Sequence, residues 1–308
     1  MFTQKMTKTI LTILFLNLIT VAFAQQDPQY TQYMYNQAII NPAYAGSNES
    51  LSLVSLYRNQ WTGFEGAPKT LTVSAHTPLR EKTGIGISFI SDQLGPVKEN
   101  NIYADFSYTI NLGNSSKLAF GIKAGLTVHD IALNSGIITF EPGDPLFRSD
   151  VSKVTPNVGF GSFLYSDNYY IGLSVPNILN STHLDNDGIA FGNETKHYFF
   201  TSGYVFQLSK QIKFKPSFLI KSSFDSPVSF DVNANFLFYD RFELGASYRN
   251  IDSFSGLIGF SITENIRIGY AYDHIISDLK IASTSSHEVF LVFDFYFKNK
   301  VSRSPRFF

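Results

Sequence analysis

The sequence contains no cysteine and few charged residues. Without cysteine the chain has no disulfide framework, no thiol nucleophile and no Cys-ligated metal site. Asp, Glu, Lys and Arg together make up 16% of the residues, against roughly 25% in a typical soluble domain. The formal net charge is −1, so the chain lacks the basic footprint of a nucleic-acid-binding protein. These absences exclude thiol chemistry and weigh against nucleic acid as a partner.

Long apolar runs are also missing beyond the N-terminus. Residues 1–24 are typical of a cleaved signal peptide: Lys5 and Lys8 precede an apolar stretch, and Ala22, Phe23 and Ala24 form an A-x-A cleavage site. The apolar stretch is shorter than the ~20 residues that a spanning helix needs, and no longer one follows it. We therefore expect an exported mature chain without a transmembrane helix.

What the mature chain does contain is period-two alternation of apolar and polar residues. In one segment the apolar positions are Phe230, Val232, Ala234, Phe236 and Phe238. Between them lie the polar residues Asp231, Asn233 and Asn235. A helix would scatter these apolar residues around its axis, whereas a strand places them all on one face.

Alternation of this kind recurs along the chain and predicts about fourteen antiparallel strands, an even number as in bacterial outer-membrane barrels. The expected strands are 50–58, 68–79, 84–91, 101–112, 116–130, 154–166, 168–175, 195–208, 212–222, 227–238, 241–250, 254–262, 265–273 and 287–297. The even-numbered connections are short. Most of the odd-numbered ones are longer, namely 59–67, 92–100, 131–153, 176–194 and 274–286. Long loops on one side and short turns on the other are typical of outer-membrane barrels, whose short turns are periplasmic.

The sequence therefore predicts an all-β transmembrane barrel in the cell outer membrane, formed by residues 50–297. Within hydrocarbon every backbone N–H and C=O must be paired, so a spanning sheet has to close on itself. The apolar stripes would then face lipid and the polar stripes the lumen. A soluble β-sandwich, with its apolar face inward, is the alternative. The low charge content favours the barrel.

The flanking segments do not follow the strand pattern. Residues 25–49, rich in Gln, Tyr, Asn and Pro, predict an ordered irregular segment that either plugs the lumen or meets a periplasmic partner. Residues 298–308 form a basic tail that ends in Phe307 and Phe308. Because the strand number is even, both ends of the chain are expected on the periplasmic side.

Little in the sequence points to catalysis. The six histidines are scattered and form no zinc-protease motif. No cofactor or metal is expected, and a barrel hydrolase stays only as a remote alternative because triads are spatial. Glycines recur at alternate, inward-facing positions, namely Gly84, Gly86, Gly121, Gly125, Gly159 and Gly161. They mark either close approach of a plug or relief of wall curvature, and we favour curvature.

Trp61 is the only tryptophan and lies in the first long loop, close to Arg58 and Phe64. An amphipathic ring in this position suits a membrane-interface anchor. Alternatively, Trp61 is part of a recognition surface. The preference of Trp for membrane interfaces favours the anchor.

Three blocks of the sequence resemble the PorP/SprF family. They are DPQYTQYMYNQAIINPAYAGS at 27–47, RNQWTGFEGAPKT at 58–70 and GIGISFISDQLGP at 84–96. Weaker similarity continues in IRIGYAYDH at 266–274, SSHEVFLVFDF at 285–295 and SPRFF at 304–308. The region of about 130–200 matches no motif of the family.

The resemblance implies a component of the type IX secretion system of Bacteroidota that assists secretion or surface anchoring of particular large proteins, such as gliding adhesins. It also implies partners: the secretion machinery with its periplasmic ring components, the secreted cargo, and outer-membrane lipid. The residues in the resembling blocks that we expect to bind partners are Asn41, Pro42, Tyr44, Gly46, Arg58, Trp61 and Phe64. The runner-up function is a diffusion or uptake channel for small solutes, because fourteen strands leave room for a lumen.

Overall fold

The computed structural model describes residues 29–48, 50–113, 115–133, 150–179, 182–186, 189–193, 195–223, 226–281 and 283–296. The expected signal peptide and the C-terminal tail lie outside these residues, as does most of the connection at 131–153.

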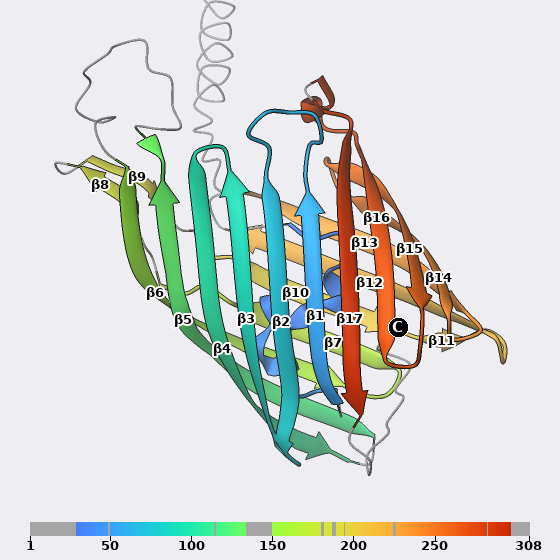
Figure 1. Ribbon diagram of the computed structural model, residues 1–308. Coiled ribbons are helices and arrows are strands. Elements are labelled where there is room, and N and C mark those ends of the chain that lie inside the picture. Colours follow the sequence, from blue (N-terminus) through green and yellow to red (C-terminus); the bar gives the residue numbers. More distant parts are fainter. Residues whose placement is uncertain are drawn as a thin grey trace, which may run out of the picture.

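The strands form one closed antiparallel ring (Figure 1). Their bounds are β1 Ser50–Asn59, β2 Lys69–Arg80, β3 Thr83–Leu94, β4 Val97–Leu112, β5 Ser116–Ile131, β6 Val151–Tyr165, β7 Tyr169–Val175, β10 Tyr198–Tyr204, β11 Phe206–Gln207, β12 Ile212–Ser223, β13 Ser226–Phe238, β14 Phe242–Arg249, β15 Ser253–Ser261, β16 Ile266–Ile275 and β17 Ser285–Tyr296. Neighbours in the chain pair in order, β1 pairs with β17, and β10 joins β7 to β12. Only Val205 separates β10 from β11, so the pair counts as one strand and the barrel has fourteen, as predicted.

The two faces of the wall have the polarity of a membrane barrel. In β13 the inward residues Asp231, Asn233 and Asn235 are no more than 2% exposed, whereas the outward residue Val232 is 46% exposed. The same arrangement, with buried polar residues inside and exposed apolar residues outside, recurs around the ring. The exposed outward side chains include Ile87, Phe106, Phe120 and Leu173. A soluble sandwich would bury these apolar residues, so the sandwich alternative is wrong.

The connections sort by end, with one correction. All connections at one end, here named the short-turn end, are short: 81–82, 113–115, 166–168, 208–211, 239–241 and 262–265. The opposite long-loop end carries 60–68, 132–150, 176–197 and 276–284. The predicted long loop at 92–100 is instead a two-residue turn at 95–96, because β3 and β4 extend until Leu94 pairs with Val97. Connection 176–197 contains an unpredicted hairpin, β8 (Thr182–Asn186) and β9 (Ile189–Asn193).

The helices of the described residues are η1 (Tyr33–Tyr35), α2 (Gln37–Ile40), η2 (Pro42–Tyr44) and η4 (Asp278–Ile281). None of them is long or apolar enough to span a membrane.

The outward face gives the first prediction. Ile122 lies in the middle of β5 and is 51% exposed, while Ile281 in η4 is 89% exposed but lies outside the strands. Ile122→Arg should lower the free energy of unfolding in phospholipid vesicles by about 2–4 kcal/mol, since the guanidinium must enter hydrocarbon. Ile281→Arg, the control, should change it little. Urea titration followed by tryptophan fluorescence measures both, and equal effects would contradict the placement of β5 in the bilayer.

Candidate functional site in the barrel lumen

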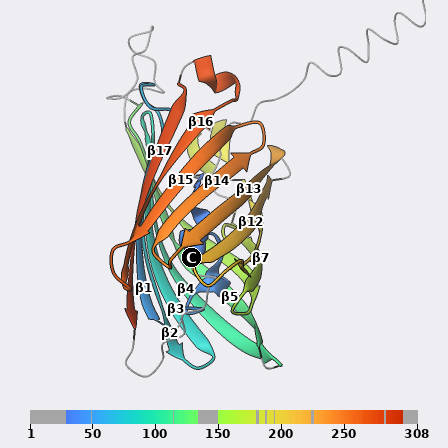
Figure 2. The ribbon, with the colours of Figure 1, turned by 90° about the vertical axis from the view of Figure 1, so that its right-hand side faces the viewer.

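Residues 29–48, here named the lumenal segment, fill the interior of the barrel. The blue ribbon lies inside the ring of strands in both views (Figures 1 and 2). All of its residues are buried except Gln29 and Gly46, which are half-buried. At one end Tyr30 bonds Thr72, near the long-loop end of β2, and at the other Asn48 bonds Asp294, near the short-turn end of β17. The segment therefore runs the length of the lumen, and its first described residue lies toward the long-loop end. The two ends of the chain, which the even strand number predicts on the periplasmic side, lie outside the described residues.

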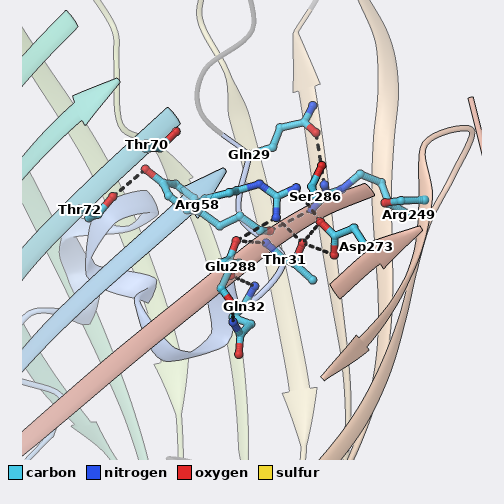
Figure 3. Close-up of polar contacts among 12 residues, drawn as sticks. Gln29, Thr31, Gln32, Arg58, Thr70, Thr72, Arg249, Asp273, Ser286 and Glu288 are labelled. Atoms are coloured by element: carbon cyan, nitrogen blue, oxygen red, sulfur yellow. Dashed lines mark hydrogen bonds and ion pairs between the residues drawn. The ribbon is translucent and has the colours of Figure 1, made fainter. Parts of the chain in front are cut away.

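A cluster of buried charges holds the segment at the long-loop end (Figure 3). Arg58 in β1 pairs with Asp273 in β16 at 2.7 Å and with Glu288 in β17 at 3.0 Å. The Glu288 carboxylate accepts hydrogen bonds from the backbone N–H groups of Thr31 at 2.9 Å and Gln32 at 2.7 Å. Three strands and the segment thus meet in one network, in which each buried charge has an opposite charge beside it.

A second arginine extends this network across the lumen. Arg249 in β14 pairs with Asp231 in β13 at 2.7 Å, and its Nη2 donates to the Tyr30 carbonyl at 2.9 Å. Its Nη1 reaches Asp252 at 3.4 Å and the Gln29 side chain at 3.3 Å. Removing one partner from a buried pair of this kind leaves an uncompensated charge, which costs about 3–5 kcal/mol.

The middle of the segment is held by aromatic packing. Tyr35 stacks on Phe290 with ring centroids 4.2 Å apart, and the cations of Lys215 and Arg267 lie 5.4 and 5.7 Å from the Tyr35 centroid. Tyr33 accepts a hydrogen bond from Asn233 at 3.1 Å and donates to Ser217 at 3.4 Å.

The NPAYAG block forms a tight turn against the wall near the short-turn end. The Asn41 side chain caps η2 by accepting from the Ala43 N–H at 3.0 Å, and its amide donates to the Ser162 carbonyl at 3.0 Å. Pro42 occupies the first position of η2, where its missing N–H costs nothing. The ring of Tyr44 lies edge-on to Phe163, 5.3 Å between centroids. Gly46 has a φ of +70°, which favours glycine.

The glycines of the wall are the surfaces on which this turn rests. A Cβ on Gly121 would collide with the backbone of Pro42 and Ala43, and one on Gly161 with the Asn41 side chain. A Cβ on Gly84 would collide with the backbone of Ala45. The structure therefore favours close approach of the plug at these positions, and the curvature interpretation was wrong for them. A Cβ on Gly125 would instead meet Ile102 and Tyr103 of the wall, and one on Gly159 would meet Pro176 in connection 176–197. A Cβ on Gly86 would be in ordinary contact with Ala45 and Asp105.

The residues predicted to bind partners fall into three places. Asn41, Pro42, Tyr44 and Gly46 lie together near the short-turn end of the lumen. Arg58 is buried in the charged cluster at the opposite end. Trp61 and Phe64 lie in connection 60–68, where the Trp61 N–H donates to the Ser286 hydroxyl at 3.0 Å and Phe64 is 50% exposed.

Sequence reasoning missed the partners of Arg58. Asp273, Glu288 and Arg249 all lie on the polar stripes that the alternation defines, so their inward orientation was predictable. Their convergence on Tyr30 and Thr31 was not, because the contacts join residues more than 200 positions apart. Among the described residues, no group of three or more His, Asp or Glu side chains could hold a metal ion.

The closed ring, apolar outside and charged inside, is that of an outer-membrane β-barrel. Residues 22–293 match the family described as type IX secretion system membrane protein PorP/SprF, and the chain belongs to this family. It is therefore an outer-membrane component of that secretion system.

Several solved structures are similar to the chain at low sequence identity. The CymD monoaromatic hydrocarbon channel is similar with a TM-score of 0.53 and 10% identity, over 87% of this chain and 93% of that one. A FadL homologue of Pseudomonas aeruginosa gives 0.49 and 12%, over 90% and 96% of the two chains. Omp33 of Acinetobacter baumannii gives 0.48 and 7%, over 80% and 97%. No curated protein sequence matches the chain.

The glycine contacts give the second prediction. Gly121→Ala should destabilise the folded barrel by about 1–3 kcal/mol, because the added methyl group overpacks the turn at Pro42 and Ala43. Gly256→Ala is the matched control, since a Cβ at that strand position meets nothing within 4 Å. The heat-dependent gel shift and urea titration report on both. If Gly121→Ala is as stable as Gly256→Ala, the turn does not rest on this glycine.

Proposed function

We propose that the protein is a non-enzymatic accessory of type IX secretion that assists secretion or surface anchoring of particular cargo proteins. The barrel is a rigid scaffold and the cargo is held by its long-loop end. The observation that carries this proposal is the filled lumen: the buried segment 29–48 occupies the space through which a conduit would have to pass. A barrel whose lumen is packed can present a binding surface at its end without forming an open channel.

The long-loop end supplies a surface suited to cargo. Connection 60–68 is tied to connection 276–284 and to the start of β17. The Ser283 hydroxyl donates to the Thr62 carbonyl at 2.9 Å, and the Thr62 N–H donates to the Ser285 carbonyl at 2.8 Å. These hydrogen bonds hold Trp61 beside Ser286. The ring of Phe64 and the aliphatic side chain of Ile281 are exposed on the same two connections. Exposed aromatic and aliphatic residues on a rigid support are typical anchors of protein interfaces.

The lumenal residues contribute differently in this proposal. Asn41, Pro42 and Tyr44 are buried, so they act by fixing the lumenal segment rather than by presenting side chains to cargo. Arg58 supports the same segment from the opposite end. Periplasmic ring components would then meet the short turns, on the side where outer-membrane barrels face the periplasm.

The cargo surface gives the third prediction. In cells, Trp61→Ala with Phe64→Ala should lower the amount of cargo at the surface about tenfold, through loss of anchor contacts. Phe120→Ala is the control, because Phe120 has the same 50% exposure as Phe64 but lies in the wall at β5. A proteomic census of surface proteins, compared with that of a gene deletion, identifies the cargo. Normal cargo levels in the double variant would refute the role of this loop.

Uptake of small solutes is the competing function, and conductance separates the two. The purified full chain in planar bilayers should show no steady open pore, because the lumenal segment occupies the lumen. An open-pore barrel of similar strand number, measured in parallel, controls for successful insertion. Steady conductance of this chain would favour the channel over the scaffold.

A further inference from the structure

The charged cluster at the long-loop end, formed by Arg58, Asp231, Arg249, Asp273 and Glu288, is buried to an unusual degree. Each of these five residues is at most 5% exposed. Buried ion pairs add little net stability compared with apolar packing of the same volume. An arrangement of five such groups therefore calls for a role other than stabilising the barrel.

The cluster contacts both the main chain and the side chains of the lumenal segment. Glu288 accepts the N–H groups of Thr31 and Gln32, and Arg249 donates to the carbonyl of Tyr30. Gln32 adds only a 3.4 Å hydrogen bond from its side chain to the Glu288 carbonyl. The Thr31 hydroxyl contacts both Asp273 and Arg58, and the Gln29 side chain accepts a hydrogen bond from Arg249 at 3.3 Å. The three backbone contacts do not depend on side-chain identity, so an extended polypeptide other than residues 29–32 can make them.

The two ends of the segment are held by different means. Near the short-turn end, residues 41–46 are locked by shape, because Gly84, Gly121 and Gly161 leave no space between wall and turn. Near the long-loop end, residues 29–32 are held by hydrogen bonds and charge, and a cavity of about 30 Å³ adjoins them, lined in part by Gln29, Tyr30 and Arg249. The guanidinium Nε of Arg58, in the charged cluster, is buried without a hydrogen-bond partner. The cluster therefore contains one N–H donor that residues 29–32 do not use.

We propose that the charged cluster is a binding site for an extended polypeptide, which residues 29–32 occupy as a built-in ligand. An extended segment of another protein, entering from the long-loop end, replaces residues 29–32 while residues 41–46 stay in place. The incoming chain offers two consecutive N–H groups to Glu288 and a carbonyl to Arg249. This proposal does not depend on the cargo role, since it concerns exchange within the purified barrel.

The natural chain has no cysteine, so one introduced thiol is a unique reporter. Gln32→Cys keeps the backbone N–H that Glu288 accepts, and Ala43→Cys reports on the shape-locked end, where Ala43 is 0% exposed. The purified full-length variants, shown to be folded by their heat-dependent gel shift, are treated with a thiol reagent. A synthetic peptide of residues 29–36, QYTQYMYN, is the added probe. The control is the same peptide with Thr31→Pro and Gln32→Pro, which lacks the two N–H donors.

The first peptide should speed labelling of Gln32→Cys about tenfold, because it shifts the local opening equilibrium. The proline peptide should have no effect, and Ala43→Cys should stay unlabelled throughout. Labelling of Gln32→Cys that neither peptide changes would overturn the proposal, as would equal labelling of both cysteine variants. If Gln32→Cys does not fold, Thr31→Cys at the same site replaces it, with the same outcomes.

Discussion

The structure depends on one constraint, which is that no backbone group can stay unpaired within the hydrocarbon of a membrane. Fourteen strands satisfy it by closing into a ring, with β1 on β17 and β10 between β7 and β12. Closure turns the polar stripes inward and creates a lumen lined by groups such as Asn233, Asn235 and Lys215. These groups need partners, and the chain provides them from its own residues 29–48, so the interior is packed rather than open.

Packing of that interior uses two kinds of contact. Near the short-turn end the wall has glycine where the turn at Asn41–Gly46 approaches it, and the fit is steric. Near the long-loop end Arg58, Asp273 and Glu288 hold the segment through charge-assisted hydrogen bonds, which are individually strong but can be replaced by equivalent groups. The same segment is therefore fixed at one end and exchangeable in principle at the other. The surface that we propose for cargo lies beyond the exchangeable end.

Most of the fold could be predicted from the sequence, because strand alternation is local. Phe236 and Asn235 fall on opposite faces whatever the rest of the chain does, and all fourteen strands were placed by such patterns. The features that could not be predicted from the sequence depend on tertiary contacts. The turn at 95–96 needs the pairing of β3 with β4, and the meaning of Gly121 needs Pro42 beside it. Arg58 and Glu288 are 230 positions apart, and no local signal joins them.

Hydrogen–deuterium exchange on the full-length protein in lipid vesicles measures whether residues 29–48 fill the lumen. The backbone amides of residues 33–46 should exchange as slowly as those of β5 and β13, because they are buried in the same core. Exchange of these amides at the rate of an unstructured peptide, while the strands stay protected, would show that the lumen is not packed and would contradict the account.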